Sequence, residues 1–250
     1  MEKSRLLYDL HTHTVYSHGK GSIRDNYETA KKMGLSEIGI ADHGPDHALY
    51  GVKAKDFLRM RREIDLINEE RGEGDPKLLL GVEANIINPD GSMDLASEFA
   101  DGFDFIIAGY HFGTMGNAPI KALGTHMASL LYNMTGWSTE RIKNRNSSLV
   151  INAVYANRIT LLSHPGAKGA VDIEAIARAC AERGTLLEIN NKHGYLTVEG
   201  IRRAAKYDVE FIIGSDAHSP SDVGRCSSAL GRAAEAGLDP ERIVNLRGGY

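Results

Sequence analysis

The stretch RLLYDLHTHTVYSH, residues 5–18, begins as an apolar, strand-like run and ends with His11, His13 and His18 within eight residues. Side chains alternate along a β-strand, so His11 and His13 point the same way and Thr12 points the opposite way. Neutral imidazole is a ligand of zinc, manganese and iron. The stretch therefore predicts a strand that ends in a metal site, against the alternative of a polar turn with incidental histidines.

The rest of the chain alternates short apolar runs with helical patterns. Most of the runs are continuously apolar, which is typical of strands covered on both faces. This order predicts an α/β fold with a parallel sheet closed or nearly closed into a barrel, with a doubly wound open sheet as the alternative. The expected strands are residues 5–10, 36–41, 77–83, 103–109, 158–163, 185–190 and 210–215.

Several helices have readable ends. Ser22 with Asp25 predicts a capping box, and Gly34 follows at the expected stop. Asp172 is expected to cap a helix that Gly184 closes. Further helices are expected over 54–70, after Thr197 and after Asp239.

The segment 112–145 breaks this rhythm because it is long for a connection and rich in Gly, Met and Asn. Long loops in compact domains are often functional. We therefore expect one domain over 1–250 with an expanded loop at 112–145, either a substrate lid with Tyr132, Met134 and Trp137 or a subunit contact. The oligomeric state stays open.

Composition narrows the classes of partner. The chain carries 29 Lys+Arg against 33 Asp+Glu, for a net charge of −4, and has no basic run, so an obligate nucleic-acid partner is not expected. The N-terminal apolar stretch is too short for a signal peptide, and no segment is long enough to span a membrane. With only Cys180 and Cys226, nothing resembles a disulfide scaffold, so we expect a cytoplasmic protein.

Polar residues follow nearly every expected strand. Because the carboxyl ends of parallel strands share one face, these residues should converge there. Nine ligands without a thiolate suggest two or three divalent ions of zinc, manganese or iron. The expected ligands are His11, His13, His18, His43, Glu83, His111, His164, Asp216 and His218. The other histidines, His47, His126 and His193, are interpreted first as hydrogen-bonding or surface residues.

The motifs DLHTHTVYSHG, IADHG, GVEANI, FDFIIAGYH, LLSHPG, LEINN and GSDAH occur in this order. They resemble the successive motifs of the PHP (polymerase and histidinol phosphatase) family, and most of all its stand-alone YcdX-like phosphatases. The resemblance covers about residues 6–246.

The resemblance implies a distorted (β/α)7 TIM-like barrel with a trinuclear metal centre, usually of zinc. Carried over motif by motif, one ion would bind His11, His13, Glu83 and Asp216. A second would share Glu83 and add His111 and His164, and a third would bind His18, His43 and His218. The long segment 112–145 departs from the family pattern and leaves the substrate open.

These observations predict a metal-dependent phosphoesterase that hydrolyses small phosphate monoesters through a metal-bridging hydroxide. The metal charges favour an anionic substrate even on an acidic chain. Glu83 and Asp216 are the expected catalytic carboxylates: Glu83 bridges two ions, and Asp216 binds one and steers the attacking water.

Further residues are expected near the reacting groups. Contacts to the phosphorylated substrate are expected from Lys20, Lys192, His193 and Arg225. Hydrogen bonds that orient ligands or water are expected from Asp42, Asn190 and Asn191.

Other functions remain possible at this level. Within the same chemistry, the alternatives are a histidinol-phosphate phosphatase and a nuclease or phosphodiesterase. A carbon–nitrogen hydrolase on a similar barrel would often use a carboxylated lysine, and no lysine stands at a strand end in that role. A non-catalytic metal-bound scaffold is the alternative outside enzymes.

Overall fold

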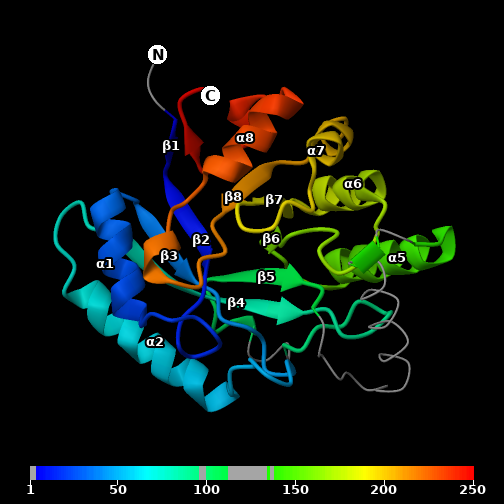
Figure 1. The fold of residues 1–250 in the computed structure, drawn as a ribbon. Coiled ribbons are helices and arrows are strands. Elements are labelled where there is room, and N and C mark those ends of the chain that lie inside the picture. Colours follow the sequence, from blue (N-terminus) through cyan, green and yellow to red (C-terminus); the bar gives the residue numbers. More distant parts are fainter. Residues whose placement is uncertain (1–3, 96–99, 112–133, 136–137) are drawn as a thin grey trace.

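Seven parallel strands form the centre of the part of the chain that the structure describes. The computed structural model describes residues 4–95, 100–111, 134–135 and 138–250. The strands are hydrogen-bonded in sequence order, from β2 to β8 (Figure 1). Their bounds are β2 Tyr8–Thr12, β3 Glu37–Ile40, β4 Lys77–Asn85, β5 Phe105–Gly109, β6 Leu161–Leu162, β7 Leu186–Asn190 and β8 Phe211–Gly214.

Helices surround this sheet. Figure 1 shows α1 and α2 on one side of the strands and α5 to α8 on the other. The predicted caps are confirmed: the Ser22 and Asp25 capping box starts α1, and Gly34 and Gly184 end α1 and α6 with φ of 68° and 66°. The bounds are α1 Ile23–Met33, α2 Ala54–Glu69, α5 Glu140–Ala156, α6 Ile173–Arg183, α7 Val198–Ala204 and α8 Ser227–Ala236, with short 3₁₀ turns at Pro220–Asp222 and Pro240–Arg242.

The first and last strands of the sheet meet at the carboxyl-end rim, so the barrel is nearly closed. Thr12 and Ala217 form a parallel bridge there. The amide of His13 donates to the Ala217 carbonyl at 2.8 Å, and the Ala217 amide donates to the His11 carbonyl at 3.3 Å. The barrel is thus confirmed over the open sheet, and its seam lies within the histidine-rich stretch.

Below the rim, a buried asparagine joins the two strands. The Asn245 Nδ2 group donates to the carbonyls of Tyr8 and Ile213, both at 2.8 Å. Its Oδ1 accepts from the Ile213 amide at 3.0 Å. The side chain therefore replaces ladder hydrogen bonds that β2 and β8 cannot make directly.

The expected strand 5–10 is wrong as a single element. Arg5–Leu6 forms β1, which pairs antiparallel with β9, Leu246–Arg247, and the barrel strand starts only at Tyr8. The break has a physical cause: the Leu7 amide donates to the Asn245 carbonyl at 2.8 Å. The chain's last strand therefore takes up the first residues of the predicted run.

An apolar layer fills the barrel interior beneath the rim. Phe105 packs there with residues such as Leu10 and Ile212. Its ring takes the space of two missing side chains, since a Cβ on Gly39 or Gly81 would lie 2.4 or 2.2 Å from it. The polar rim therefore lies directly above an apolar layer.

The expanded loop lies mostly outside the described residues, which exclude 112–133 and 136–137. Its last residues, 140–145, form the start of α5, while His126, Tyr132 and Trp137 lie outside the described part. The choice between lid and subunit contact therefore stays a prediction. Among the described residues, no helix is long and apolar enough to cross a membrane.

Candidate metal centre

The Glu83 carboxylate, at the carboxyl end of β4, is the hub of the site. It is 1% exposed, and imidazole nitrogens surround both of its oxygens. Oε1 lies 3.0 Å from His164 Nε2, 3.2 Å from His111 Nε2 and 3.4 Å from His11 Nε2. Oε2 lies 3.1 Å from His43 Nδ1 and 3.6 Å from His13 Nε2.

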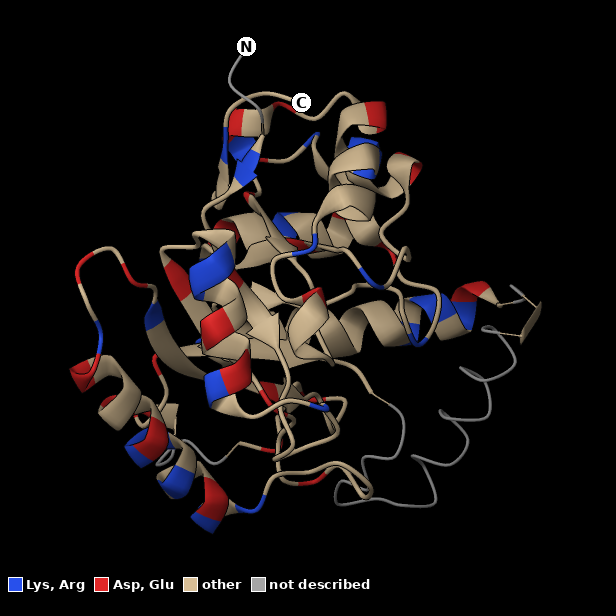
Figure 2. Cartoon of the chain, turned by 60° about the vertical axis from the view of Figure 1, so that its left-hand side comes forward, with Lys and Arg blue, Asp and Glu red and all other residues tan. Residues whose placement is uncertain are grey.

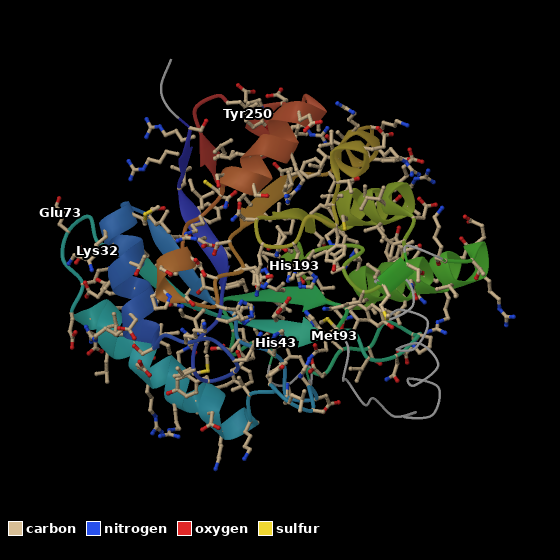
Figure 3. All side chains as sticks on the ribbon, in the orientation of Figure 1. Lys32, His43, Glu73, Met93, His193 and Tyr250 are labelled. Atoms are coloured by element: carbon tan, nitrogen blue, oxygen red, sulfur yellow. The ribbon has the colours of Figure 1, made fainter. Side chains whose placement is uncertain are left out.

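Asp216 forms a second hub on the same rim. Its Oδ1 lies 3.2 Å from His218 Nδ1 and 3.6 Å from His13 Nε2, so His13 stands between the two carboxylates. The Nε2 atoms of His218 and His18 are 2.5 Å apart. The structure therefore brings all nine predicted ligands together at the strand ends; Figure 3 labels His43 among them.

A β-bulge and two residues with positive φ help to orient these side chains. The pairing of β2 with β3 shifts register between Asp9 and Thr12, within the stretch that carries His11. His164 and Asp216 adopt positive φ of 25° and 54°, which is uncommon outside glycine. Bulges and positive φ of this kind cluster at functional sites.

The ionisation states suit a cation. Although burial acts to raise it, the neighbouring imidazoles of His111, His11 and His43 hold the pKa of Glu83 well below its usual value. Burial lowers the pKa of His43 well below its usual value and that of His18 to about 3. Glu83 is thus ionised beside the neutral imidazoles of His43 and His18, and these are the forms in which both groups bind metals.

Several buried imidazole nitrogens of the site also have no hydrogen-bond partner among the described residues. Among the described residues, His11 Nε2, His13 Nδ1 and His18 Nδ1 are buried without a hydrogen-bond partner. Such atoms are rare in folded proteins unless an ion or water satisfies them. Three groups have ligand atoms within 4.8 Å of one another: His11, His13 and Glu83; His13, Asp216 and His218; and His43, Glu83 and His111.

The three groups fit a divalent metal bound by nitrogen and oxygen. The first contains three of the four ligands expected for one ion, His11, His13 and Glu83, while the fourth, Asp216, falls in the second group with His13 and His218. His43 differs from expectation: its Nδ1 lies 3.1 Å from Glu83, which places it with His111, although its ring also stacks on His18 at 4.9 Å. The assignment of His43 to one ion thus stays a prediction.

Glu188 in β7 is a site residue that the sequence reasoning missed. It is fully buried, and its Oε1 lies 2.7 Å from His11 Nδ1. Its Oε2 accepts from the His164 amide at 2.8 Å. Although burial acts to lower it, the carboxylates of Glu188 and Glu83 raise the pKa of His11 well above its usual value. A charged residue in the apolar run TLLEIN, two positions before Asn190, was the available signal.

The three residues expected to orient the site have different roles. Buried Asp42 accepts from the Thr14 amide at 2.8 Å and from the Ser17 hydroxyl, which holds the loop between His13 and His18. Asn190 Nδ2 donates to Asp216 Oδ2 at 3.2 Å. Asn191 instead accepts from the amides of Ser228 and Ala229, at the start of α8, and so faces away from the ligands.

A cavity of about 350 Å³ opens onto the ligands. Of the expected substrate contacts, Lys192 and His193 line it, and Lys192 Nζ lies 3.6 Å from Asp216 Oδ1. Lys20 and Arg225 are not among its described lining residues, and Arg225 pairs with Asp222 at 3.0 Å.

Sequence reasoning also missed three residues that line this cavity. His47, interpreted first as a hydrogen-bonding or surface residue, lines the cavity, and its ring stacks on that of His43 at 5.3 Å. Tyr50 stacks on His18 at 4.3 Å, and Lys168 lines the cavity from the loop after β6. None of the three had a distinctive motif.

Family models match nearly the whole described chain. The PHP domain model matches residues 9–192, and the PHP-associated model matches residues 199–244. The proteins named "Probable phosphatase YcdX" from Shigella dysenteriae and Escherichia coli are each 31% identical over 256 aligned positions, covering 95% of this chain and 89% of theirs.

Two solved structures share the fold. One is a candidate histidinol phosphatase from Listeria monocytogenes, with a TM-score of 0.64 and 17% identity, matched over 87% of this chain and 97% of that one. The other is a histidinol phosphate phosphatase from Lactococcus lactis, in complex with zinc, L-histidinol and phosphate. It has a TM-score of 0.59 and 13% identity, over 93% and 94% of the two chains. At these identities, the structures show a common fold.

Proposed function

The chain belongs to the PHP family of metal-dependent phosphatases, and from this premise we propose that it hydrolyses small phosphate monoesters at a trinuclear zinc centre. The observation that supports the proposal most is Glu83, with five imidazole nitrogens within 3.6 Å of its oxygens. The zinc and phosphate of the Lactococcus complex support the metal and the substrate class. Manganese or iron would suit the same nitrogen and oxygen ligands.

The nine predicted ligands would hold the ions; Glu83 would contribute to more than one of them, and Asp216 lines the cavity. Divalent ions supply Lewis acidity: they lower the pKa of a water molecule to about 7 and neutralise phosphoryl oxygens. The protein's part is to gather these ligands at the rim, above the apolar layer that fills the barrel interior. Asp216, held by Asn190, is positioned to orient the attacking water.

Two kinds of side chain line the cavity, cationic and apolar or aromatic, and they would contact different parts of the substrate. Lys192 and Lys168 both line the cavity and would attract the phosphate, with His193 beside them. Leu49 and Tyr50 line the same cavity and are 78% and 38% exposed. They would contact the leaving group, which therefore needs an apolar part.

Histidinol phosphate is one candidate among such monoesters, since the Lactococcus protein of the same fold was captured with histidinol and phosphate. A nuclease is less favoured, because Figure 2 shows Lys and Arg interspersed with Asp and Glu along the helices of the visible face. A scaffold is less favoured because the ligand set is complete. We place the protein in the cytoplasm, where Cys180 and Cys226 would stay the free thiols that the structure shows.

Phosphate release from a panel of monoesters tests the proposal. The panel holds p-nitrophenyl phosphate, nucleoside monophosphates, sugar phosphates and histidinol phosphate, each with zinc or manganese added. Glu83→Gln should abolish turnover, while the isosteric change Glu73→Gln, at an exposed loop, should leave it unchanged. A metal-loaded protein that releases no phosphate from any of the esters would refute the proposed function.

A further inference from the structure

We infer that Asp94 is a positioning residue that holds His43 and His111 in place around Glu83, and that it thereby sets the affinity of one metal ion of the centre. The inference rests on the proposed metal centre but concerns a residue that binds no metal itself. Asp94 follows β4, outside every motif that the sequence singles out. Its side chain is buried, with 8% exposed.

The Asp94 carboxylate receives N–H groups from two segments. From β4, the Asn85 amide donates to Oδ1 at 2.7 Å and the Asn85 side chain donates to Oδ2. From the loop after β3, the Asp46 amide donates to Oδ2 at 3.1 Å. The Asp94 amide returns a bond to the Asn85 carbonyl at 3.0 Å. Asp94 thus joins β4 to the loop that follows His43.

The hydrogen bond from the Asn85 side chain to Asp94 decides which atom of Asn85 faces His111. Because the Nδ2 group of Asn85 is held by Asp94, its Oδ1 faces His111 Nδ1, at 2.7 Å. An amide oxygen accepts only, so His111 must carry its proton on Nδ1. The lone pair of Nε2 then points toward Glu83 Oε1, 3.2 Å away. Such partners fix both the tautomer and the ring orientation of a metal-binding histidine.

The hydrogen bond from the Asp46 amide ties Asp94 to the loop that follows His43. Gly44 packs directly on Asp94, since a Cβ there would lie 2.3 Å from Asp94 Oδ1. The Gly44 amide donates to the Glu83 carbonyl at 2.9 Å, and His43 forms a bridge with Glu83. One carboxylate therefore acts on both histidines of the group His43, Glu83 and His111.

A carboxylate is not the group that stability alone would place here. Burial raises the pKa of Asp94 to about 6, against the hydrogen bonds that favour its charged form. An asparagine of the same shape would avoid burying a charge, but it could not accept all three N–H groups. The carboxylate accepts all three N–H groups and therefore holds Asn85 and Asp46 in one orientation.

The test compares Asp94→Asn with Asp90→Asn, an exposed aspartate of the same segment whose side chain accepts from Ser92. Each apo-protein is titrated with zinc alone against chelators of graded strength, and bound zinc is counted by mass spectrometry. Asp94→Asn should weaken one of the bound ions by about 10- to 100-fold and leave the others, while Asp90→Asn matches the wild type. Unchanged affinity of every ion in a folded Asp94→Asn protein would overturn the inference.

A second measurement needs no metal. Nitrogen-15 chemical shifts of His111 in the apo-protein report its tautomer, which should be protonated on Nδ1 in the wild type and mixed in Asp94→Asn. If Asp94→Asn does not fold, Asn85→Ala breaks the same link and should give the same two results. A wild type that binds no zinc would refute the proposed centre, whereas an unchanged His111 tautomer in both variants would refute the role of Asp94.

Discussion

Replacing Glu188 by glutamine tests whether the buried carboxylate behind His11 sets metal affinity. Glu188 accepts three N–H groups: His11 Nδ1 at 2.7 Å on Oε1, and the His164 amide and Asn190 Nδ2 at 2.8 and 2.9 Å on Oε2. Space does not limit the exchange, because glutamine has the shape of glutamate. What changes is that one acceptor oxygen becomes a donor.

Neither orientation of the glutamine satisfies all three donors. If its NH₂ group faces His11, Nδ1 must accept, and the proton moves to Nε2, which points toward Glu83 at 3.4 Å. If its NH₂ group faces His164 instead, two buried donors lose their acceptor, at about 1–3 kcal/mol each. We expect zinc affinity to fall by about 10- to 100-fold, or about 1.4–2.8 kcal/mol, in the first case. In the second case the apo-protein loses stability instead.

Chelator-competition titration with zinc and urea unfolding of the apo-protein together distinguish these outcomes. Glu182→Gln is the matched control, since this exposed glutamate accepts only from the Tyr155 hydroxyl among the described residues. If Glu188→Gln changes neither zinc affinity nor the free energy of unfolding, the role assigned to Glu188 is refuted.

Further perturbations give separate results. Asp94, with a pKa of about 6 when folded against 3.8 otherwise, binds its proton more tightly in the folded state; its stabilising contribution is therefore full below pH 4 and is lost as pH rises through 6. Urea titrations of the apo-protein should show wild type losing up to about 3 kcal/mol relative to Asp94→Asn between pH 4 and 7. Chelation should lower the melting temperature, because zinc at about 1,000 times its Kd stabilises by about 4 kcal/mol; an unchanged melting temperature would speak against a bound ion. Asn245→Leu should cost about 3 kcal/mol or more in urea unfolding, since it leaves the Tyr8 and Ile213 groups of the seam unpaired; a loss within 0.5 kcal/mol would contradict that role. Gly81→Ala should cost about 1–3 kcal/mol by the same assay, because its Cβ would overlap Phe105, and wild-type stability would show that the ring can move.

The convergence of the proposed metal ligands could be predicted because each signal is local. His11, Glu83 and Asp216 are polar residues at the ends of apolar runs, and parallel strands bring such ends together whatever the loops do. The same alternation predicted a parallel sheet covered by helices, but it did not separate a barrel from an open sheet; the bridge between Thr12 and Ala217 decides for the barrel. The seam could not be predicted, because Asn245 and β1 depend on where the chain's last residues return to the first strand.

Residues that hold the ligands could not be predicted in the same way. Glu188, Asn85 and Asp94 are common residue types, and each acts through a partner at least nine positions away. His47 and Lys168 line the cavity because of loop paths, which no periodicity encodes. Asn191 shows the reverse case: it follows a strand as a site residue would, yet its side chain holds the start of α8.

The energetic cost of the rim explains why its residues depend on one another. Positive φ at His164 and Asp216 costs about 1–3 kcal/mol each, and the buried Glu83, Glu188 and Asp216 carboxylates repel one another. His11 lies between two of these carboxylates, and Glu188 and Glu83 raise its pKa well above its usual value even though burial acts to lower it. Divalent ions held at the proposed centre would bring more positive charge to the same carboxylates. Metal binding and folding should therefore be coupled most strongly at His11, the residue that touches both Glu83 and Glu188.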